Sequence, residues 1–284
     1  MKVIVKIVLI SLIFINVLIL PAYADSYLDK SITLKESGVV EAHHMVQKIP
    51  NNEISIESVK NIDTVKSAVG TLQNTKNKFY GTAFAIDDYT LITNNHVVEE
   101  NFGIAKEPKY HPEKPENLIF SPSRNGDKRP YQFTIKDVKM IKGADVAILH
   151  TNKKLSSYIT PLKLANIQDL PHLKFKDNIT VLGYPAKGYL PELFSKDLKY
   201  TMYVSKGYYL MKAKSIDPQF YIKSIVRKGS SGSPILNSEN EVIGIIMDGS
   251  NNVNASLTVR SKNELAYVFE LSGYVREQIE KERY

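Results

Sequence analysis

A cluster of serines and glycines at residues 229–234, Gly-Ser-Ser-Gly-Ser-Pro, has the residue types that nucleophilic catalysis needs. A serine hydroxyl attacks a carbonyl carbon once a neighbouring base removes its proton. The glycine two residues before Ser231 permits a tight turn that aims the main-chain N–H groups of Gly229 and Ser231 at one point. There they would stabilise the negative oxygen that forms during the attack. On its own, such a stretch is equally typical of a flexible hairpin loop.

The candidate base is His96, which follows the apolar run Leu91-Ile92-Thr93 after two asparagines. A histidine just beyond the end of a buried strand is held at a fixed place, as a base that activates a serine must be. The simpler alternative is a loop histidine without a chemical role.

An acidic residue, Asp145, leads straight into the apolar run Val146-Ala147-Ile148-Leu149, so we expect its carboxylate to be partly buried. Buried beside an imidazole, it would fix the tautomer and stabilise the imidazolium that forms during attack. The alternative is an aspartate that only ends a strand edge. The order of the three residues along the chain, and the agreement of their contexts, favour a catalytic triad of His96, Asp145 and Ser231.

The elements that must position these residues are short β-type runs separated by turn residues, a pattern typical of an all-β sandwich or barrel. The region from 78 to 262 suits two small barrels better than one. We expect a first β-barrel over 78–170, with the histidine and aspartate, and a second over 171–260, with the serine. Residues 261–264, Ser-Lys-Asn-Glu, have capping-box form. A C-terminal helix over 261–284 is predicted by apolar residues at helical spacing, namely Leu265, Val268, Leu271, Val275 and Ile279.

Four stretches resemble the trypsin-like serine peptidases, and within them the staphylococcal group of glutamyl endopeptidases, exfoliative toxins and secreted serine-protease-like proteins. The stretches are residues 93–98, 145–148, 181–185 and 229–234, the last continuing into 240–245. The resemblance implies two six-stranded antiparallel β-barrels with the triad between them, hydrolysis of peptide bonds through an acyl-enzyme, and export from the cell. It implies no metal and no other cofactor. One departure is Ser230, where the family usually has asparagine or aspartate.

The specificity pocket of this family is walled by the segment before the nucleophile and by the strand after it. In the acid-specific relatives a histidine and a threonine receive the substrate carboxylate, whereas this chain has Ile246 and Val226 at those places. An apolar wall cannot offset the desolvation of a carboxylate, so we expect an uncharged residue on the acyl side of the cleaved bond. Arg227 or Lys228 reaching over the rim would restore an acidic preference, and Asp248 would attract a basic residue. The predicted pocket residues are Val226, Arg227, Lys228, Ile246, Met247 and Asp248.

The N-terminus predicts export. Lys2 and Lys6 precede the apolar stretch Ile7–Leu20, and residues 22–24, Ala-Tyr-Ala, suit a signal peptidase. The stretch is shorter than the roughly 20 residues that span a bilayer. We therefore expect residues 1–24 to be a signal peptide, and the protein to be secreted without stable membrane insertion.

Residues 25–77 are polar and mixed, which is typical of a pro-segment or an N-terminal extension, with a helix predicted over 41–47. His43 and His44 lie in that helix. Adjacent helical positions point in different directions, so these two are better read as surface histidines than as a metal site.

Composition limits the partners. The chain has no cysteine, which excludes disulfides, thiolate nucleophiles and cysteine-ligated metals. The formal net charge of +7 includes Lys2 and Lys6, which a signal peptidase would remove. The remaining cations are scattered, without the basic run and interleaved aromatics of a nucleic-acid site. We expect a monomer that acts on protein or peptide substrates and binds no nucleic acid.

Two other classes of function fit the same sequence. A toxin-like or binding protein could keep the protease fold with little or no turnover, because fold alone does not fix function. Ser230 favours this alternative. An exported adhesin or cell-wall-binding module would be favoured by the positive charge.

Overall fold

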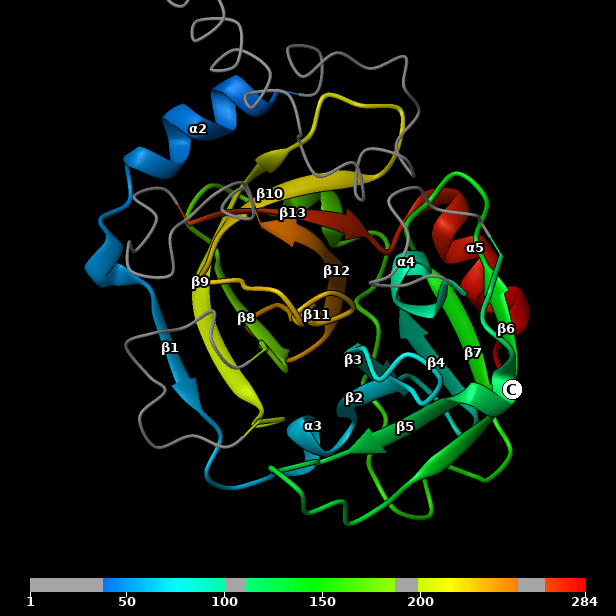
Figure 1. The fold of residues 1–284 in the computed structure, drawn as a ribbon. Helices are drawn as coiled ribbons and strands as arrows, with labels where there is room; N and C mark the ends of the chain where they lie inside the picture. The colour runs from blue at the N-terminus through cyan, green and yellow to red at the C-terminus, as the bar shows by residue number, and fades with distance from the viewer. Residues whose placement is uncertain (1–37, 101–110, 187–198, 250–263) are drawn as a thin grey trace, which may run out of the picture.

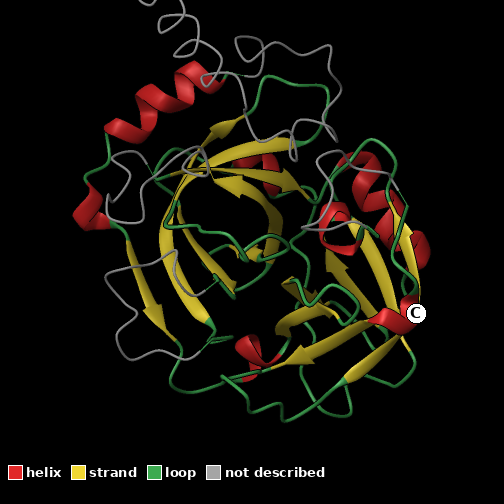
Figure 2. Cartoon of the chain, viewed as in Figure 1, coloured by secondary structure: helices red, strands yellow, loops and turns green. Residues whose placement is uncertain are grey.

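The computed structural model describes residues 38–100, 111–186, 199–249 and 264–284, and it confirms the two six-stranded antiparallel barrels expected from the sequence (Figure 1). Strands make up most of both barrels, and the longer helices lie at the outside (Figure 2). No helix within these four segments is long and apolar enough to cross a membrane. The predicted signal peptide, residues 1–24, lies outside the described residues.

The first barrel closes in the order β2-β3-β4-β7-β6-β5. Phe84, Ile92 and Leu149 are fully buried in its core. Strand β7 is buried along its whole length because core side chains fill one face while the C-terminal helix lies beside the other (Figure 1). The strands are β2 (Val69–Asn74), β3 (Tyr80–Ala85), β4 (Thr90–Thr93), β5 (Leu118–Pro122), β6 (Phe133–Met140) and β7 (Ala147–Thr151).

The second barrel runs β9-β10-β13-β12-β11-β8 and closes through pairing of β8 with β9. A short strand outside the ring, β1 (Ser55–Ser58), pairs with the first half of β9, and β10 pairs with the second half. Its strands are β8 (Asn178–Gly183), β9 (Tyr203–Lys212), β10 (Gln219–Lys223), β11 (Pro234–Leu236), β12 (Val242–Gly249) and β13 (Leu265–Glu270).

The segment before the barrels is part of the folded body. Strand β2 belongs to the first barrel, so this barrel begins at Val69 and not at the predicted residue 78. Helix α2 (Val39–Gln47) covers apolar side chains of the second barrel, including Leu210 and Tyr221. Residues 39–77 therefore fold with the barrels instead of forming a separate extension.

A buried lysine of the second barrel forms hydrogen bonds to the end of α2. The side chain of Lys223, 1% exposed, donates to the carbonyl of Val46 over 3.0 Å and also to that of Ile49, both at the helix C-terminus. Burial lowers the pKa of this ammonium, and the charges of Glu264 and Glu53 oppose that change. A cation is favourable at this end of a helix because the unpaired carbonyls carry partial negative charge.

The C-terminal helix is shorter than the sequence predicts. Leu265–Glu270 form strand β13, and helix α5 spans only Gly273–Glu282. Apolar residues on both faces of this run, with Tyr267, Val268 and Phe269 in succession, suit a strand between two neighbours better than a surface helix. Second-barrel residues thus continue past the predicted boundary at 260. Val275 and Ile279 of α5 are core residues, as expected.

Helix α5 returns to the first barrel, where His150 binds its end. The ring Nδ1 lies 2.7 Å from a carboxylate oxygen of Asp137, and Nε2 lies 2.7 Å from the carbonyl oxygen of Glu282. Tyr284 packs edge-on against the same ring.

Candidate active site

The predicted base and its carboxylate lie together. His96 sits on the short helix α4 (Asn95–Val98), which follows β4 directly. Its Nδ1 lies 2.8 Å from Oδ2 of Asp145, and its main-chain N–H donates to Oδ1 over 3.1 Å. The Asp145 side chain is 1% exposed and that of His96 is 12% exposed. A carboxylate held at both oxygens fixes the orientation of the ring, as an acid–base histidine requires.

The two asparagines before the histidine hold the loop that carries the aspartate. Nδ2 of Asn94 donates to the carbonyl of Asp145 over 2.7 Å. Nδ2 of Asn95 donates to the carbonyls of Ile141 and Ala144, over 3.0 and 2.5 Å. Both asparagines are buried. The main chain before His96 and the main chain around Asp145 are thereby joined independently of the imidazole.

The candidate nucleophile lies on a tight loop between β10 and β11. The N–H of Ser230 donates to the carbonyl of Arg227 over 3.0 Å, which forms a turn just before Ser231. Gly232 has φ +84°, and a Cβ there would lie 1.9 Å from the carbonyl oxygen of Thr82, so only glycine fits. Ser231 is half-buried, whereas Ser230 and Ser233 are 5% and 0% exposed. Exposure therefore favours Ser231 as the reactive serine of the three.

Strand β3 of the first barrel fixes this loop through Thr82. Its N–H donates to the carbonyl of Ser231 over 2.8 Å, and its Oγ1 donates to the carbonyl of Gly229 over 3.0 Å. Oγ1 of Thr93, three residues before His96, donates to the carbonyl of Thr82. The serine loop of the second barrel and the histidine of the first are therefore fixed to the same pair of strands.

The main chain at the predicted oxyanion donors, Gly229 and Ser231, forms part of the tight loop. Gly229 has φ +91°, and its Cα packs against the main chain of Tyr184 and Ala186. Among the described residues, no hydrogen bond uses the main-chain N–H of Gly229 or of Ser231. Two unused donors on one tight loop suit a developing negative charge. The turn before Ser231 is closed by a main-chain hydrogen bond, from the N–H of Ser230 to the carbonyl of Arg227.

The predicted pocket residues differ in exposure. Val226 and Ile246 pack together in the core of the second barrel, and Met247 is also buried. Lys228 is exposed, and the side chain of Asp248 lies outside what the structure describes. The side chain of Arg227 binds the buried Glu264 through two hydrogen bonds, Nη1–Oε2 at 2.7 Å and Nη2–Oε1 at 2.8 Å.

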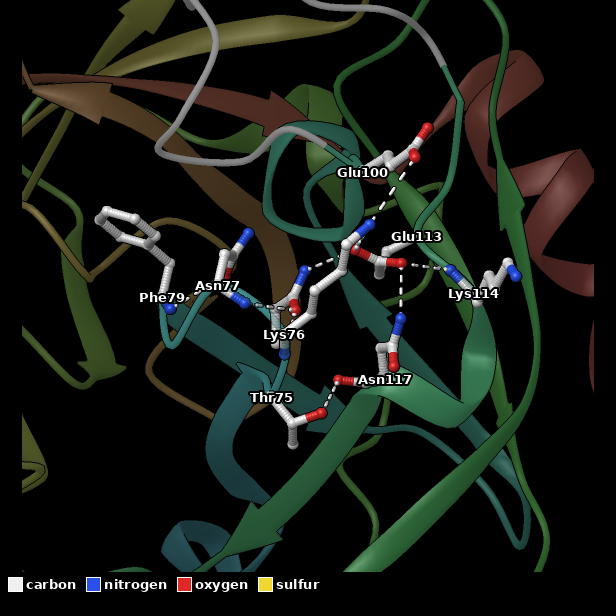
Figure 3. Close-up of polar contacts among 9 residues, drawn as sticks. Thr75, Lys76, Asn77, Phe79, Glu100, Glu113, Lys114 and Asn117 are labelled. Atoms are coloured by element: carbon white, nitrogen blue, oxygen red, sulfur yellow. Dashed lines mark hydrogen bonds and ion pairs between the residues drawn. The ribbon is translucent and has the colours of Figure 1, made fainter.

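A buried glutamate ties the chain beyond α4 to the β2–β3 hairpin (Figure 3). The carboxylate of Glu113 accepts from Nδ2 of Asn117 over 2.8 Å, from Nδ2 of Asn74 over 3.0 Å and from the N–H of Lys114 over 2.9 Å. Burial opposes its ionisation, but these bonds together hold the pKa of Glu113 below its ordinary value. The Glu113 N–H in turn donates to the carbonyl of Val98 at the end of α4.

Metal ligands do not gather in the described segments. Groups of three or more histidine, aspartate or glutamate side chains that could hold an ion are absent from them. On α2, His43 is half-buried and His44 is exposed.

Comparison with known proteins identifies the class. The family model of the trypsin-like peptidase domain matches residues 81–245, more than half of the chain, and the chain belongs to this family. A solved Glu endopeptidase in complex with MPD is 14% identical with a TM-score of 0.60, covering 80% of this chain and 95% of its own. The active form of the Rv3671c protease from M. tuberculosis is 19% identical with a TM-score of 0.51, covering 76% and 81%. At these identities, the likeness concerns the fold.

Several residues that position the site were not singled out from the sequence. Thr82 lies at the start of the family match, and the two asparagines lie within the motif around His96, so local sequence offered a signal for them. Local sequence gave no signal that Glu264 is the partner of Arg227. The two are 37 positions apart, and only the pairing of β10 with β13 brings them together.

Proposed function

We propose that the chain is an exported serine endopeptidase with the catalytic triad His96, Asp145 and Ser231. The observation that carries this proposal is the 2.8 Å contact between Nδ1 of His96 and Oδ2 of Asp145, beside a serine loop fixed by Thr82. Family membership and the protease fold support the class of reaction. Export rests on residues 1–24, which resemble a signal peptide.

The proposed reaction is acyl transfer to the serine. Oγ of Ser231 attacks the carbonyl carbon of the substrate while Nε2 of His96 takes its proton. The N–H groups of Gly229 and Ser231 donate to the oxyanion. His96 then protonates the leaving amine, and water hydrolyses the acyl-enzyme by the reverse steps. The carboxylate of Asp145 orients the ring and stabilises the imidazolium.

Labelling with a fluorophosphonate tests this proposal directly, because the reagent reacts with an activated serine. The wild-type chain from Asp25 onward should label, and Ser231→Ala should not. Ser230→Ala and Ser233→Ala are matched controls on the same loop and should still label. Ser231→Ala and His96→Ala should each lose nearly all peptidase activity, because the two residues act as one unit. An unlabelled wild-type protein would instead favour a binding protein on a protease fold.

We also propose an apolar or other uncharged residue on the acyl side of the cleaved bond. Val226 and Ile246 are buried apolar residues, and the charge of Arg227 is already balanced by Glu264. A peptide-library cleavage profile would contradict this specificity if glutamate or aspartate dominated at that position.

A further inference from the structure

An ion pair lies immediately before the turn that carries the candidate nucleophile. Arg227 and Glu264 are joined by two parallel hydrogen bonds, and Nη1 of Arg227 also donates to the carbonyl of Val226 over 2.9 Å. Their side chains are 13% and 1% exposed. A two-point pair of this kind is the strongest geometry available to an arginine and a carboxylate.

The main chain places Glu264 here independently of its side chain. The N–H of Ser224 donates to the carbonyl of Glu264 over 2.9 Å, and Lys223 pairs with Leu265 between β10 and β13. Because the Arg227–Ser230 turn brings its ends within about 7 Å, the Cα of Arg227 lies within about 11 Å of that of Ser231. A long, flexible cation released at this place could reach the side chain of a bound substrate.

Glu264 balances this cation. The nearest buried cation on β10, Lys223, is bound to the carbonyls at the end of α2. Without the carboxylate, the guanidinium of Arg227 would lose two charge-assisted hydrogen bonds beside the apolar Val226. That loss is unfavourable for a partly buried cation, and an acidic substrate side chain would offer an equivalent acceptor.

We propose that Glu264 is a specificity-determining residue of the peptidase, which excludes acidic substrate residues by occupying Arg227. This inference rests on the proposed function. The substrate class it assigns is peptides with an uncharged residue on the acyl side. Substituting Glu264 should open the enzyme to glutamyl substrates without any change at the triad.

The test compares two peptides that differ only in a glutamyl or a leucyl residue on the acyl side. The ratio of their kcat/KM values is measured for the wild type, Glu264→Gln and Glu264→Gln/Arg227→Gln, with active enzyme counted by fluorophosphonate titration. We expect Glu264→Gln to raise the glutamyl-to-leucyl ratio about tenfold or more, the effect of one charge-assisted hydrogen bond. The double variant should lose this gain.

A matched control is Glu270→Gln, which removes a second buried glutamate, at the far end of β13, that binds Lys212 and Ser272. It should leave the ratio unchanged. Arg227→Gln provides a second test with the opposite sign if Glu264→Gln does not fold. It removes the positive charge of Arg227 from the carboxylate, so a lysyl peptide should gain on a glutamyl one.

The outcomes separate this inference from the proposed function. A wild-type protein that neither labels nor cleaves would overturn both. A labelled and active wild type whose Glu264→Gln variant keeps the wild-type ratio, or loses both activities equally, would overturn the role of Glu264 alone.

Discussion

The N–H of Thr82, on the first barrel, donates to the carbonyl of Ser231, on the second, over 2.8 Å. The threonine hydroxyl adds a bond to the carbonyl of Gly229 and accepts one from the N–H of Tyr184. Thr82 is fully buried, so water cannot replace these bonds. Thr82 therefore fixes, through its main chain and its side chain together, the loop that carries the proposed oxyanion donors.

Replacing this threonine should lower turnover. Thr82→Val keeps the shape but leaves the carbonyl of Gly229 without its donor, at a cost of about 1–3 kcal/mol. We expect kcat to fall about tenfold or more while KM changes little, because the loop acts on the transition state. Thr82→Ser keeps the hydroxyl and should retain most activity. Equal activity of the valine and serine variants would show that the hydroxyl has no role in positioning.

The asparagines before His96 should matter for catalysis although neither is expected to touch substrate. Asn94→Ala removes the bond to the carbonyl of Asp145, and Asn95→Ala removes those to Ile141 and Ala144. We expect each to reduce kcat about 10–100-fold, less than the roughly 10⁴-fold expected when the triad aspartate itself becomes asparagine. Steady-state kinetics with titrated active sites would measure this. Wild-type kcat in both variants would contradict the positioning role.

The contribution of Glu113 to the free energy of unfolding should decrease at acid pH. Its pKa is lower in the folded chain than in the unfolded chain, where a glutamate titrates near 4.3. The stabilisation is therefore complete above that value and is lost as pH falls through the lower, folded pKa. Glu113→Gln should be less stable than the wild type at pH 7, and the difference should shrink at pH 3. Urea unfolding at the two pH values measures it, and a constant difference would contradict the assignment.

The mature N-terminus should lie before residue 39. Removal of the whole segment to residue 77 would delete β2 from the first barrel and expose the apolar face under α2. We therefore expect the exported protein to begin between Asp25 and residue 38. Mass spectrometry of culture supernatant would test this, and an active form that starts at or after Val39 would contradict it.

Part of this structure could be predicted from short stretches of neighbouring residues. The triad was predicted because Asp145 leads into an apolar run, His96 follows one after two asparagines, and Ser231 lies in a glycine–serine stretch. The two barrels were expected from short β-type runs, from the length of the region and from the family resemblance. These features depend on neighbouring residues, so short windows contain them.

Other features depend on partners far along the chain. Leu265 and Val268 have helical spacing, but β10 and β12 on either side make their segment a strand. Val69–Asn74 look like a polar extension until β3 and β5 pair with them. The position of Arg227 is decided by Glu264, whose closeness is a property of the closed barrel.

Each end of the described chain packs on the barrel that is farther away in the sequence (Figure 1). Helix α2 and strand β1 come before the first barrel but pack on the second barrel. Helix α5 comes after the second barrel but packs on the first barrel. Lys223 forms a hydrogen bond to the end of α2, and His150 forms one to the end of α5. The two barrels therefore cannot separate unless α2 and β1 leave the second barrel and α5 leaves the first. A single protease cut between β7 and β8 should therefore leave the two fragments associated in native buffer, with loss of structure in one transition on heating. The two fragments would then form a non-covalent complex that does not need the peptide between β7 and β8.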